Sequence, residues 1–424
     1  MTVAPALDKL PRSTLLAVAF EHMLAGMIAT RALLPQVILR GGDLALMNQV
    51  AIDEWMGASP VYTGRMRALM GIEGDDVGAI MKALQLDCGF VHQYMDVGYR
   101  VVDEDHAEFW LEHCGALLDT EPHGEERVFG MCHTIEDPTF DATALATNPR
   151  ARIRPLHRPP RLPADRHPHC HWTITIDEAQ PPVGAVPLTE SVAALPLASV
   201  PNAVGGDLEP GGRRDYAEPF DPGFRLADLS QGALAAVTRE FQAQAHLLMC
   251  SSDLTLRARV GDDAAHRMLG DAWVGASWIA SERLRRIRPP ASPLDALADT
   301  FWLQPMVPPG FDREVTVAND AVQVTLRPQV DALLDAAHPG WCGLLAEADA
   351  RGVAAMAHGV DRQARVSGLT AGPDAAHFEV TVDHDAEPAA EPDVVALARI
   401  GMVSGWSFDT TDAIAVADPV RRPS

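Results

Sequence analysis

The chain has 424 residues, of which 47% are hydrophobic and 22% charged, values that are ordinary for globular proteins. This composition excludes a largely disordered chain, and the length suggests two or three domains. The formal charge of −24 opposes binding to nucleic acid or to an anionic membrane surface. We therefore expect a small-molecule partner, with no nucleic acid and no membrane.

The first elements in chain order are helices, predicted over residues 13–34, 44–56, 60–70 and 75–86. The run from Leu15 to Leu34 is apolar and could pass for a signal peptide, but Glu21 and Arg31 interrupt it. No small-residue cleavage site follows it clearly, and the interruptions also argue against a membrane span. With only six cysteines, the chain is not a disulfide-stapled secreted domain, so we expect a cytoplasmic protein.

Short alternating segments after the helices predict antiparallel strands near 93–102 and 107–113, then a helix over 125–136, then strands over 151–157 and 171–177. Pro138 is expected to end or kink the helix. The same succession returns later as helices over 228–250, 262–287 and 293–303, strands over 312–318 and 321–327, a helix over 343–357, and strands over 361–368 and 377–383.

Short collinear matches support an internal duplication. Trp55-Met56-Gly57-Ala58-Ser59 returns as Trp273-Val274-Gly275-Ala276-Ser277, and Arg65 and Arg67 return as Arg283 and Arg285. The predicted fold class is α+β, a tandem duplication of a unit with a helical layer on a small antiparallel sheet, packed as a pseudo-dimer. A structural role between the halves is favoured for the repeated arginines.

The predicted domains are a first α+β unit with the Cys/His site over 1–205, a Pro/Gly-rich linker over 206–224, a second, degenerate unit over 225–410, and a tail over 411–424. The chain is also compatible with a homo-oligomer.

The duplication exposes one asymmetric cluster. Three cysteines of the first half, Cys114, Cys132 and Cys170, have no counterpart in the second half, where Ala357 and Ala376 replace the last two. Thiolates and imidazoles suit zinc or iron, so we predict a cofactor of one metal ion, zinc or iron, held by the three cysteines and by His113. The chain has no CxxC motif, so the fold itself must assemble such a site.

Two other interpretations of the cysteines remain open. Buried cysteine often serves as a small hydrophobe, and cysteine to alanine is a mild core substitution. A thiolate nucleophile without metal is the third interpretation.

Polar residues near these cysteines supply the catalytic candidates His133, Glu136 and His171. Glu136 follows His133 by three residues, so the two side chains can meet on a helix, where the carboxylate would orient the imidazole or activate a metal-bound water. Strand alternation puts His169 and His171 on the face opposite Cys170, although this rule loosens near a strand end.

An arginine-rich stretch over residues 150–161 follows the predicted helix. Arginine suits bidentate recognition of carboxylates, so Arg154 and Arg158 are candidates for binding an anionic substrate. The alternative is that these arginines form salt bridges to the acidic partner half.

The order of a strand pair ending in Cys114, a helix with Cys132-His133 and a strand starting at Cys170 resembles the L-2-amino-thiazoline-4-carboxylic acid hydrolase-like proteins. It also resembles the related vinyl-reductase-like (hydrocarbon-binding) small-molecule-binding family. The resemblance covers about residues 75–177 and, faintly, 290–383. It implies an α+β ligand-binding fold with a small organic ligand beside a cysteine-based metal site. The tandem arrangement, the extra histidines and the arginine stretch depart from that pattern.

The sequence contains no GxGxxG after a strand, GxxxxGK[ST], HExxH or GxSxG motif, so nucleotide-dependent chemistry and serine hydrolysis have no support. We predict a metal-dependent enzyme that acts on a small organic acid or heterocycle by hydrolysis. The alternatives are a small-molecule-binding protein with a structural zinc site, an iron-dependent oxidoreductase or lyase, and a scaffold with core cysteines.

Overall fold

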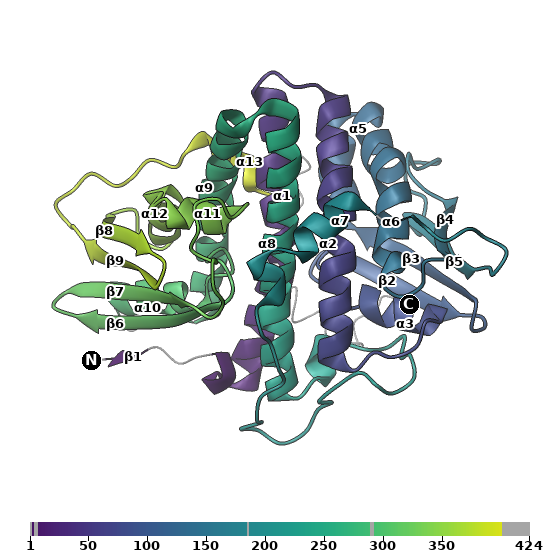
Figure 1. Ribbon diagram of the computed structural model, residues 1–424, viewed down its shortest axis with the longest axis horizontal. Coiled ribbons are helices and arrows are strands. Elements are labelled where there is room, and N and C mark those ends of the chain that lie inside the picture. Colours follow the sequence, from purple (N-terminus) through teal and green to yellow (C-terminus); the bar gives the residue numbers. More distant parts are fainter. Residues whose placement is uncertain (1, 4–6, 185, 289–291, 401–424) are drawn as a thin grey trace.

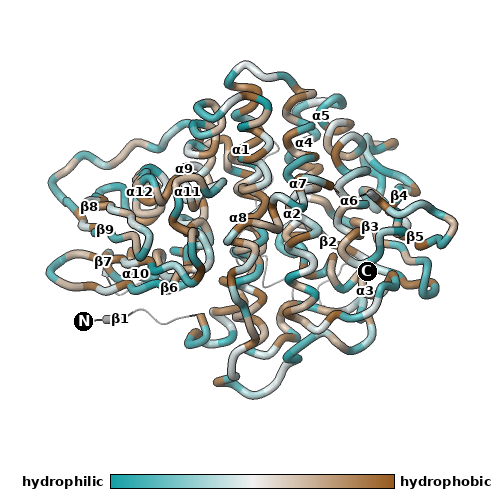
Figure 2. The backbone as a smooth tube through the Cα atoms, in the orientation of Figure 1, coloured by the Kyte–Doolittle hydropathy of each residue, from teal (hydrophilic) through white to brown (hydrophobic). Residues whose placement is uncertain are grey.

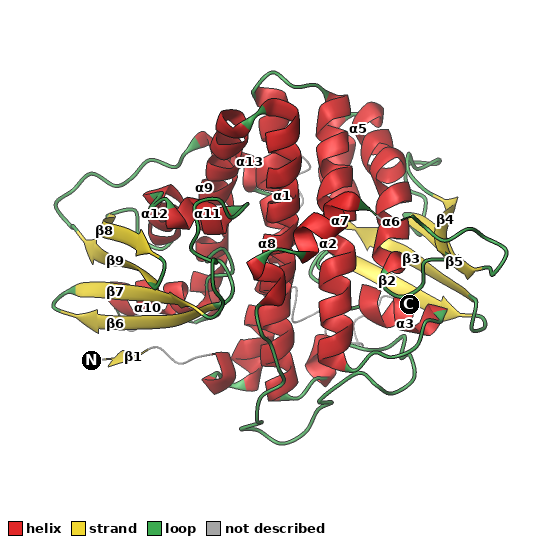
Figure 3. Ribbon diagram, in the orientation of Figure 1, coloured by secondary structure: helices red, strands yellow, loops and turns green. Residues whose placement is uncertain are grey.

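The computed structural model describes residues 2–3, 7–184, 186–288 and 292–400. Two antiparallel sheets stand on opposite sides of a layer of long helices (Figures 1 and 3). The predicted fold class, a duplicated α+β unit, is therefore confirmed.

Four long helices separate the sheets: α1 (Arg12–Leu39), α2 (Leu44–Met70), α8 (Gln231–Val260) and α9 (Asp262–Ile287). Helix α1 packs mainly on α8 and α9 of the second half, and α2 packs mainly on α8. Each half therefore places its helices against those of the other half, and hydrophobic residues run along these central helices (Figure 2).

Two reciprocal ion pairs join the halves. Arg65 of α2 lies 2.6 Å from Glu240 of α8, and Arg283 of α9 lies 2.6 Å from Glu21 of α1. Equivalent surfaces of the two halves therefore face each other across the boundary, as in an isologous dimer. Arg65 and Arg283 thus join the halves, as predicted, whereas Arg67 and Arg285 donate to backbone carbonyls of their own half, those of Ala146 and Val360.

The two sheets share one topology. The first has the order β2-β3-β5-β4 and the second has β6-β7-β9-β8, with the short strand β1 (Thr2–Val3) added beside β6. The strands of the first sheet are β2 (Met95–Val101), β3 (His106–Cys114), β4 (Ala151–His157) and β5 (Cys170–Ile176). Those of the second are β6 (Phe311–Ala318), β7 (Ala321–Pro328), β8 (Ala364–Gly372) and β9 (Ala375–Val382).

Helix α2 is continuous where the sequence predicts two helices, 44–56 and 60–70. Pro60 lies inside it and cannot donate a hydrogen bond to the carbonyl of Met56. The hydroxyl of Thr189, on α7 (Pro187–Ala193), donates to that carbonyl at 2.8 Å. A contact from a remote segment therefore compensates for the lost bond, which local sequence cannot reveal.

The predicted helix 125–136 also extends further than expected. It begins as α5 (Glu125–Phe129), widens into the π-helical turn η3 (Gly130–Ile135) and continues as α6 (Glu136–Leu145). Pro138 lies in the first turn of α6 and does not end the helix, so that part of the prediction is wrong, while the alternative that it kinks the helix stays a prediction. Its ring has no N–H to donate to the preceding turn, which here is the wider π-helical turn η3. π-Helical turns occur often at functional sites.

The remaining helices of four or more residues pack on the sheets or, as α13 (Asp393–Ala398) and the 3₁₀ helix η4 (Pro196–Ser199) do, on the long helices. The others are α3 (Val77–Leu84), α4 (Gly115–Thr120), α10 (Pro293–Leu303), α11 (Trp341–Ala346) and α12 (Ala350–His358). The predicted helix 343–357 is thus split, with a positive φ of 58° at Ala348. The predicted tail, 411–424, falls outside the described residues.

Helix α1 is the one helix of the described residues that is long and apolar enough to cross a membrane by length and composition. Its apolar stretch is 78% buried inside the protein, at the centre of the helical layer (Figure 1). Such burial is typical of a core helix.

Candidate functional site

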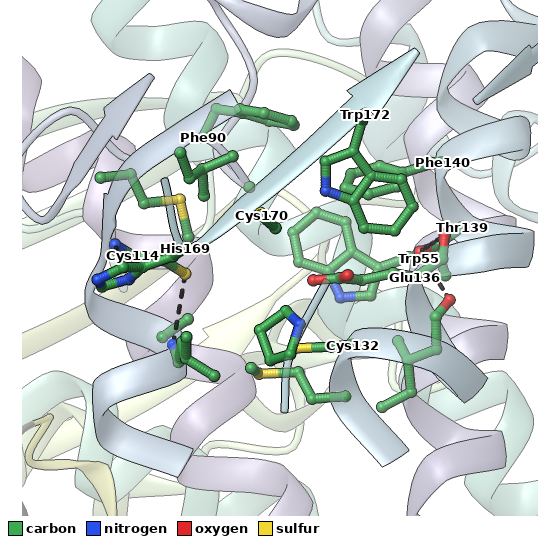
Figure 4. Close-up of a pocket in the computed structure, with 18 of the residues that line it drawn as sticks. Trp55, Phe90, Cys114, Cys132, Glu136, Thr139, Phe140, His169, Cys170 and Trp172 are labelled. Atoms are coloured by element: carbon green, nitrogen blue, oxygen red, sulfur yellow. Dashed lines mark hydrogen bonds between the residues drawn. The ribbon is translucent and has the colours of Figure 1, made fainter. Parts of the chain in front are cut away.

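A pocket of about 150 Å³ lies in the first half, between η3, α6 and the inner face of the first sheet (Figure 4). An apolar cavity of roughly this size holds a benzene-sized molecule. Most of the lining is hydrophobic, and its aromatic members are Trp55, Phe90, Phe140 and Trp172. Phe140 meets Trp172 edge to face, with ring centroids 4.8 Å apart.

The fold brings the three cysteines of the asymmetric cluster to this one pocket. Cys114 ends β3, Cys132 lies on η3 and Cys170 begins β5, and each is less than 9% exposed. The Sγ of Cys114 also accepts a hydrogen bond from the backbone N–H of Leu117 at 3.4 Å, at the start of α4. Three separate elements thus deliver the thiols, as the sequence predicts.

Burial sets the protonation of these thiols. It raises the pKa of Cys114 to about 12 and holds the pKa values of Cys132 and Cys170 well above the ordinary value. All three are neutral at pH 7 in this arrangement, which disfavours the interpretation of a thiolate nucleophile.

The donor types around the pocket suit a soft metal, but their arrangement does not. Among the described residues, no group of three or more histidine, cysteine, aspartate or glutamate side chains is placed to hold a metal ion. The predicted ligand set stays a prediction.

The histidines separate into two groups. His169 lines the pocket, and its Nδ1 accepts the backbone N–H of Cys114 at 3.1 Å, so the proton of the neutral ring sits on Nε2. Burial lowers the pKa of His169 to about 4. His113 lies beside it, with ring centroids 5.8 Å apart, outside the pocket lining.

The two catalytic candidates His133 and His171 lie elsewhere. The Nε2 of His133 donates to the carbonyl of Pro159 at 2.6 Å, and its ring stacks on Phe129. His171 lies on the outer face of the sheet, as strand alternation predicts, with Nε2 2.9 Å from a carboxylate oxygen of Glu108. Neither lines the pocket, and His133 instead fixes the loop that carries Pro159, which does.

Glu136 is the polar residue at the centre of the lining. Its carboxyl group points into the pocket between Cys132 and Trp55 (Figure 4). Its Oε2 is buried without a hydrogen-bond partner, so the predicted pairing with His133 is not formed. Burial raises the pKa of Glu136 to about 8, against the opposing effect of the positive charge on Arg158. Glu136 is therefore a neutral proton donor at pH 7.

A second carboxyl group lines the same pocket. Asp87 is 3% exposed, and its Oδ1 accepts the backbone N–H of Gly89 at 2.7 Å and the hydroxyl of Tyr62 at 3.2 Å. Burial raises the pKa of Asp87 to about 6, while these two hydrogen bonds hold it down. Asp87 is therefore ionised at pH 7. The pocket thus combines a protonated acid with a carboxylate.

The predicted substrate-binding arginines pair with acids of their own half. Arg154 contacts both carboxylate oxygens of Asp141 at 2.8 Å, and Arg158 lies 2.5 Å from Asp137. These pairs attach the arginine stretch to α6 rather than to the second half. The described residues that line the pocket include no arginine or lysine.

In the second half, alanines replace two of the cysteines that line the pocket. Ala376 pairs with Leu326 in the register in which Cys170 pairs with Leu111, which confirms that Ala376 is the counterpart of Cys170. Ala376 and Ala357 are both fully buried in the core.

Comparisons with protein families, with curated proteins and with solved structures find no match to the chain. The resemblance noted from the sequence therefore stays a prediction. The sequence reasoning missed Asp87, Trp55 and Phe140. Asp87 follows a predicted helix, but no spacing links it to the cysteine cluster.

Proposed function

We propose that the first-half pocket binds a small, weakly basic heterocycle and hydrolyses it by acid–base catalysis. The observation that carries this proposal is Glu136, a carboxyl group with an unpartnered oxygen in an apolar pocket. A buried polar group without a partner is costly, and a ligand that accepts its proton removes that cost.

Charge argues for a basic or neutral ligand over an organic acid. The lining holds two carboxyl groups, Glu136 and Asp87, and has no cationic side chain among its described residues. A carboxylate ligand would lose its hydration on entering the pocket and would find no positively charged side chain there to compensate. A ring nitrogen would instead accept the proton of Glu136, and the volume suits a single ring between aromatic side chains.

The two carboxyl groups have different roles in the hydrolysis, one as general acid and the other as general base. Glu136 donates its proton to the ring nitrogen, which makes the adjacent carbon more electrophilic. Asp87 accepts a proton from a water molecule, and the oxygen of that water bonds to the carbon. The C=N bond has now become a C–N single bond, and Asp87 returns its proton to the nitrogen. Glu136 takes the proton of the new hydroxyl group as the C–N bond breaks with its electrons on the nitrogen. The products are a carbonyl group and an amine, and both carboxyl groups return to their starting states. The Nε2–H of His169 is one donor of the lining that could bond to a developing oxyanion.

The first test is binding, measured by ligand-observed NMR with four probes: thiazoline, pyridine, benzene and benzoate. We expect thiazoline and pyridine to bind more tightly than benzoate, and Glu136→Gln to reduce this preference while benzene binding persists. Preferred binding of benzoate would contradict the charge argument.

The second test is turnover, measured by mass spectrometry as the addition of one water to the bound thiazoline. Asp87→Asn should keep thiazoline binding and lose turnover, because the amide cannot accept the proton from water. Asp141→Asn, outside the pocket, is the matched control. Binding without any product in the wild type would support the alternative of a small-molecule-binding protein and refute hydrolysis of this ring class.

A further inference from the structure

A second cavity, of about 300 Å³, lies where the two halves meet. It shares no lining residue with the pocket of Glu136. Its walls come from α1, α2 and α8, from the segment 200–202, and from the start of β6. Three arginines line it, Arg65, Arg239 and Arg313, in a chain whose formal charge is −24.

Two of these arginines are neutralised by carboxylates. Arg65 pairs with Glu240 at 2.6 Å, and Arg239 pairs with Asp8 at 2.7 Å. The third acid of the lining, Asp312, is exposed and accepts the side-chain amide of Gln329.

Arg313 differs from the other two. Its Nη1 donates to the carbonyls of Phe301, Trp302 and Gln304 at 3.0 to 3.3 Å, at the C-terminal end of α10, and no ion pair of the described residues includes it. Burial lowers the pKa of Arg313 to about 10, so the group stays positive at neutral pH. Carbonyl dipoles satisfy part of this guanidinium without cancelling its charge.

Two polar atoms of the same lining lack partners. The indole Nε1 of Trp302 is buried and bonds to nothing, and it can only donate. His22 is 1% exposed, and its Nε2 donates to the carbonyl of Leu303 at 2.8 Å. Its Nδ1, which has no partner, is therefore an acceptor.

We infer that this cavity is a second binding site, for a small oxyanion that also carries a hydroxyl group. The oxyanion would accept from Arg313 and Trp302, and the hydroxyl would donate to Nδ1 of His22. Phosphate and short hydroxycarboxylates share this chemistry. The inference is independent of the proposed hydrolysis, since the two sites have no residue in common.

The test is isothermal titration calorimetry in low-salt buffer with inorganic phosphate, glycolate and acetate. We expect saturable binding of phosphate, of glycolate or of both. The tighter ligand shows whether the site prefers phosphate or a short hydroxycarboxylate. Acetate, which lacks the hydroxyl, should bind more weakly than glycolate. An absence of saturable binding for all three would overturn the inference.

Variants of the full chain locate the site. Arg313→Gln should weaken binding by about tenfold or more, because a charge-assisted hydrogen bond is lost. Arg285→Gln is the matched control, since Arg285 also donates to a backbone carbonyl, that of Val360, but lies outside this cavity. If Arg313→Gln does not fold, as judged by circular dichroism, Trp302→Phe decides, with a several-fold loss expected. Equal affinity in wild type and Trp302→Phe would then refute the site.

Discussion

Replacing Glu136 by glutamine should remove a pH-dependent cost to folding. The pKa of Glu136 rises from its ordinary value of 4.5 to about 8 in the folded protein. Between these two pKa values the folded state keeps a proton that the unfolded state has lost, so the free energy of unfolding falls as pH rises. Glutamine has a similar shape and cannot ionise.

The size of the effect follows from the pKa shift. Each pH unit inside that window costs the folded state about 1.4 kcal/mol. Between about pH 5 and about pH 7, Glu136→Gln should therefore gain on the order of 2 kcal/mol in unfolding free energy relative to wild type. Other buried acids such as Glu54 are present in both proteins and cancel.

Urea unfolding of both proteins across this pH range, with chelator present, measures the difference. Glu178→Gln is the control, because its side chain is 88% exposed and the substitution should change little at any pH. A difference between Glu136→Gln and wild type that does not change with pH would refute the reasoning that burial keeps Glu136 protonated.

Three further outcomes are expected. Turnover of thiazoline should follow a bell-shaped pH profile, rising near pH 6 as Asp87 ionises and falling near pH 8 as Glu136 loses its proton, and a profile flat across this range would contradict the assigned roles. If the predicted metal binds, elemental analysis should find about one zinc or iron per chain in wild type and in the control Cys342→Ala, and none in Cys132→Ala. No metal in any of the three proteins would exclude the predicted metal site. Arg65→Met should lower the unfolding free energy by about 3 kcal/mol, because it leaves the buried carboxylate of Glu240 without its ion-pair partner. Arg154→Met, at an exposed ion pair, is the control and should lower it by under about 1 kcal/mol. Equal losses for the two variants in urea unfolding would contradict a special role for the inter-half pair.

The sequence was sufficient for the fold class because the same signals occur twice. The turn Asn319-Asp320 shows how directly local chemistry can specify structure. Both residues have positive φ, 52° and 58°, as a two-residue hairpin turn requires. The continuity of α2 through Pro60 escaped prediction, because its compensation comes from Thr189, more than a hundred residues away.

The candidate site was only partly predictable. Comparing the two halves identified the cysteines, and the structure places all three at one pocket. The comparison of the halves could not identify Asp87 or the cavity of Arg313. Burial decides the pKa of Asp87, and tertiary packing decides which charged side chain is left without an ion-pair partner. The direction of His171 followed from strand alternation, whereas His169 precedes the strand and escapes that rule.

Because each half packs its long helices against those of the other half, the first-half pocket is free to differ from its counterpart. Arg65–Glu240 and Arg283–Glu21 hold the boundary in the same way from both sides, so the helical layer does not depend on the pocket. The second half fills its corresponding positions with buried alanines. If Asp87→Asn abolishes turnover, no residual activity is expected from the second half, where Ala357 and Ala376 stand buried in the core at the positions of Cys132 and Cys170.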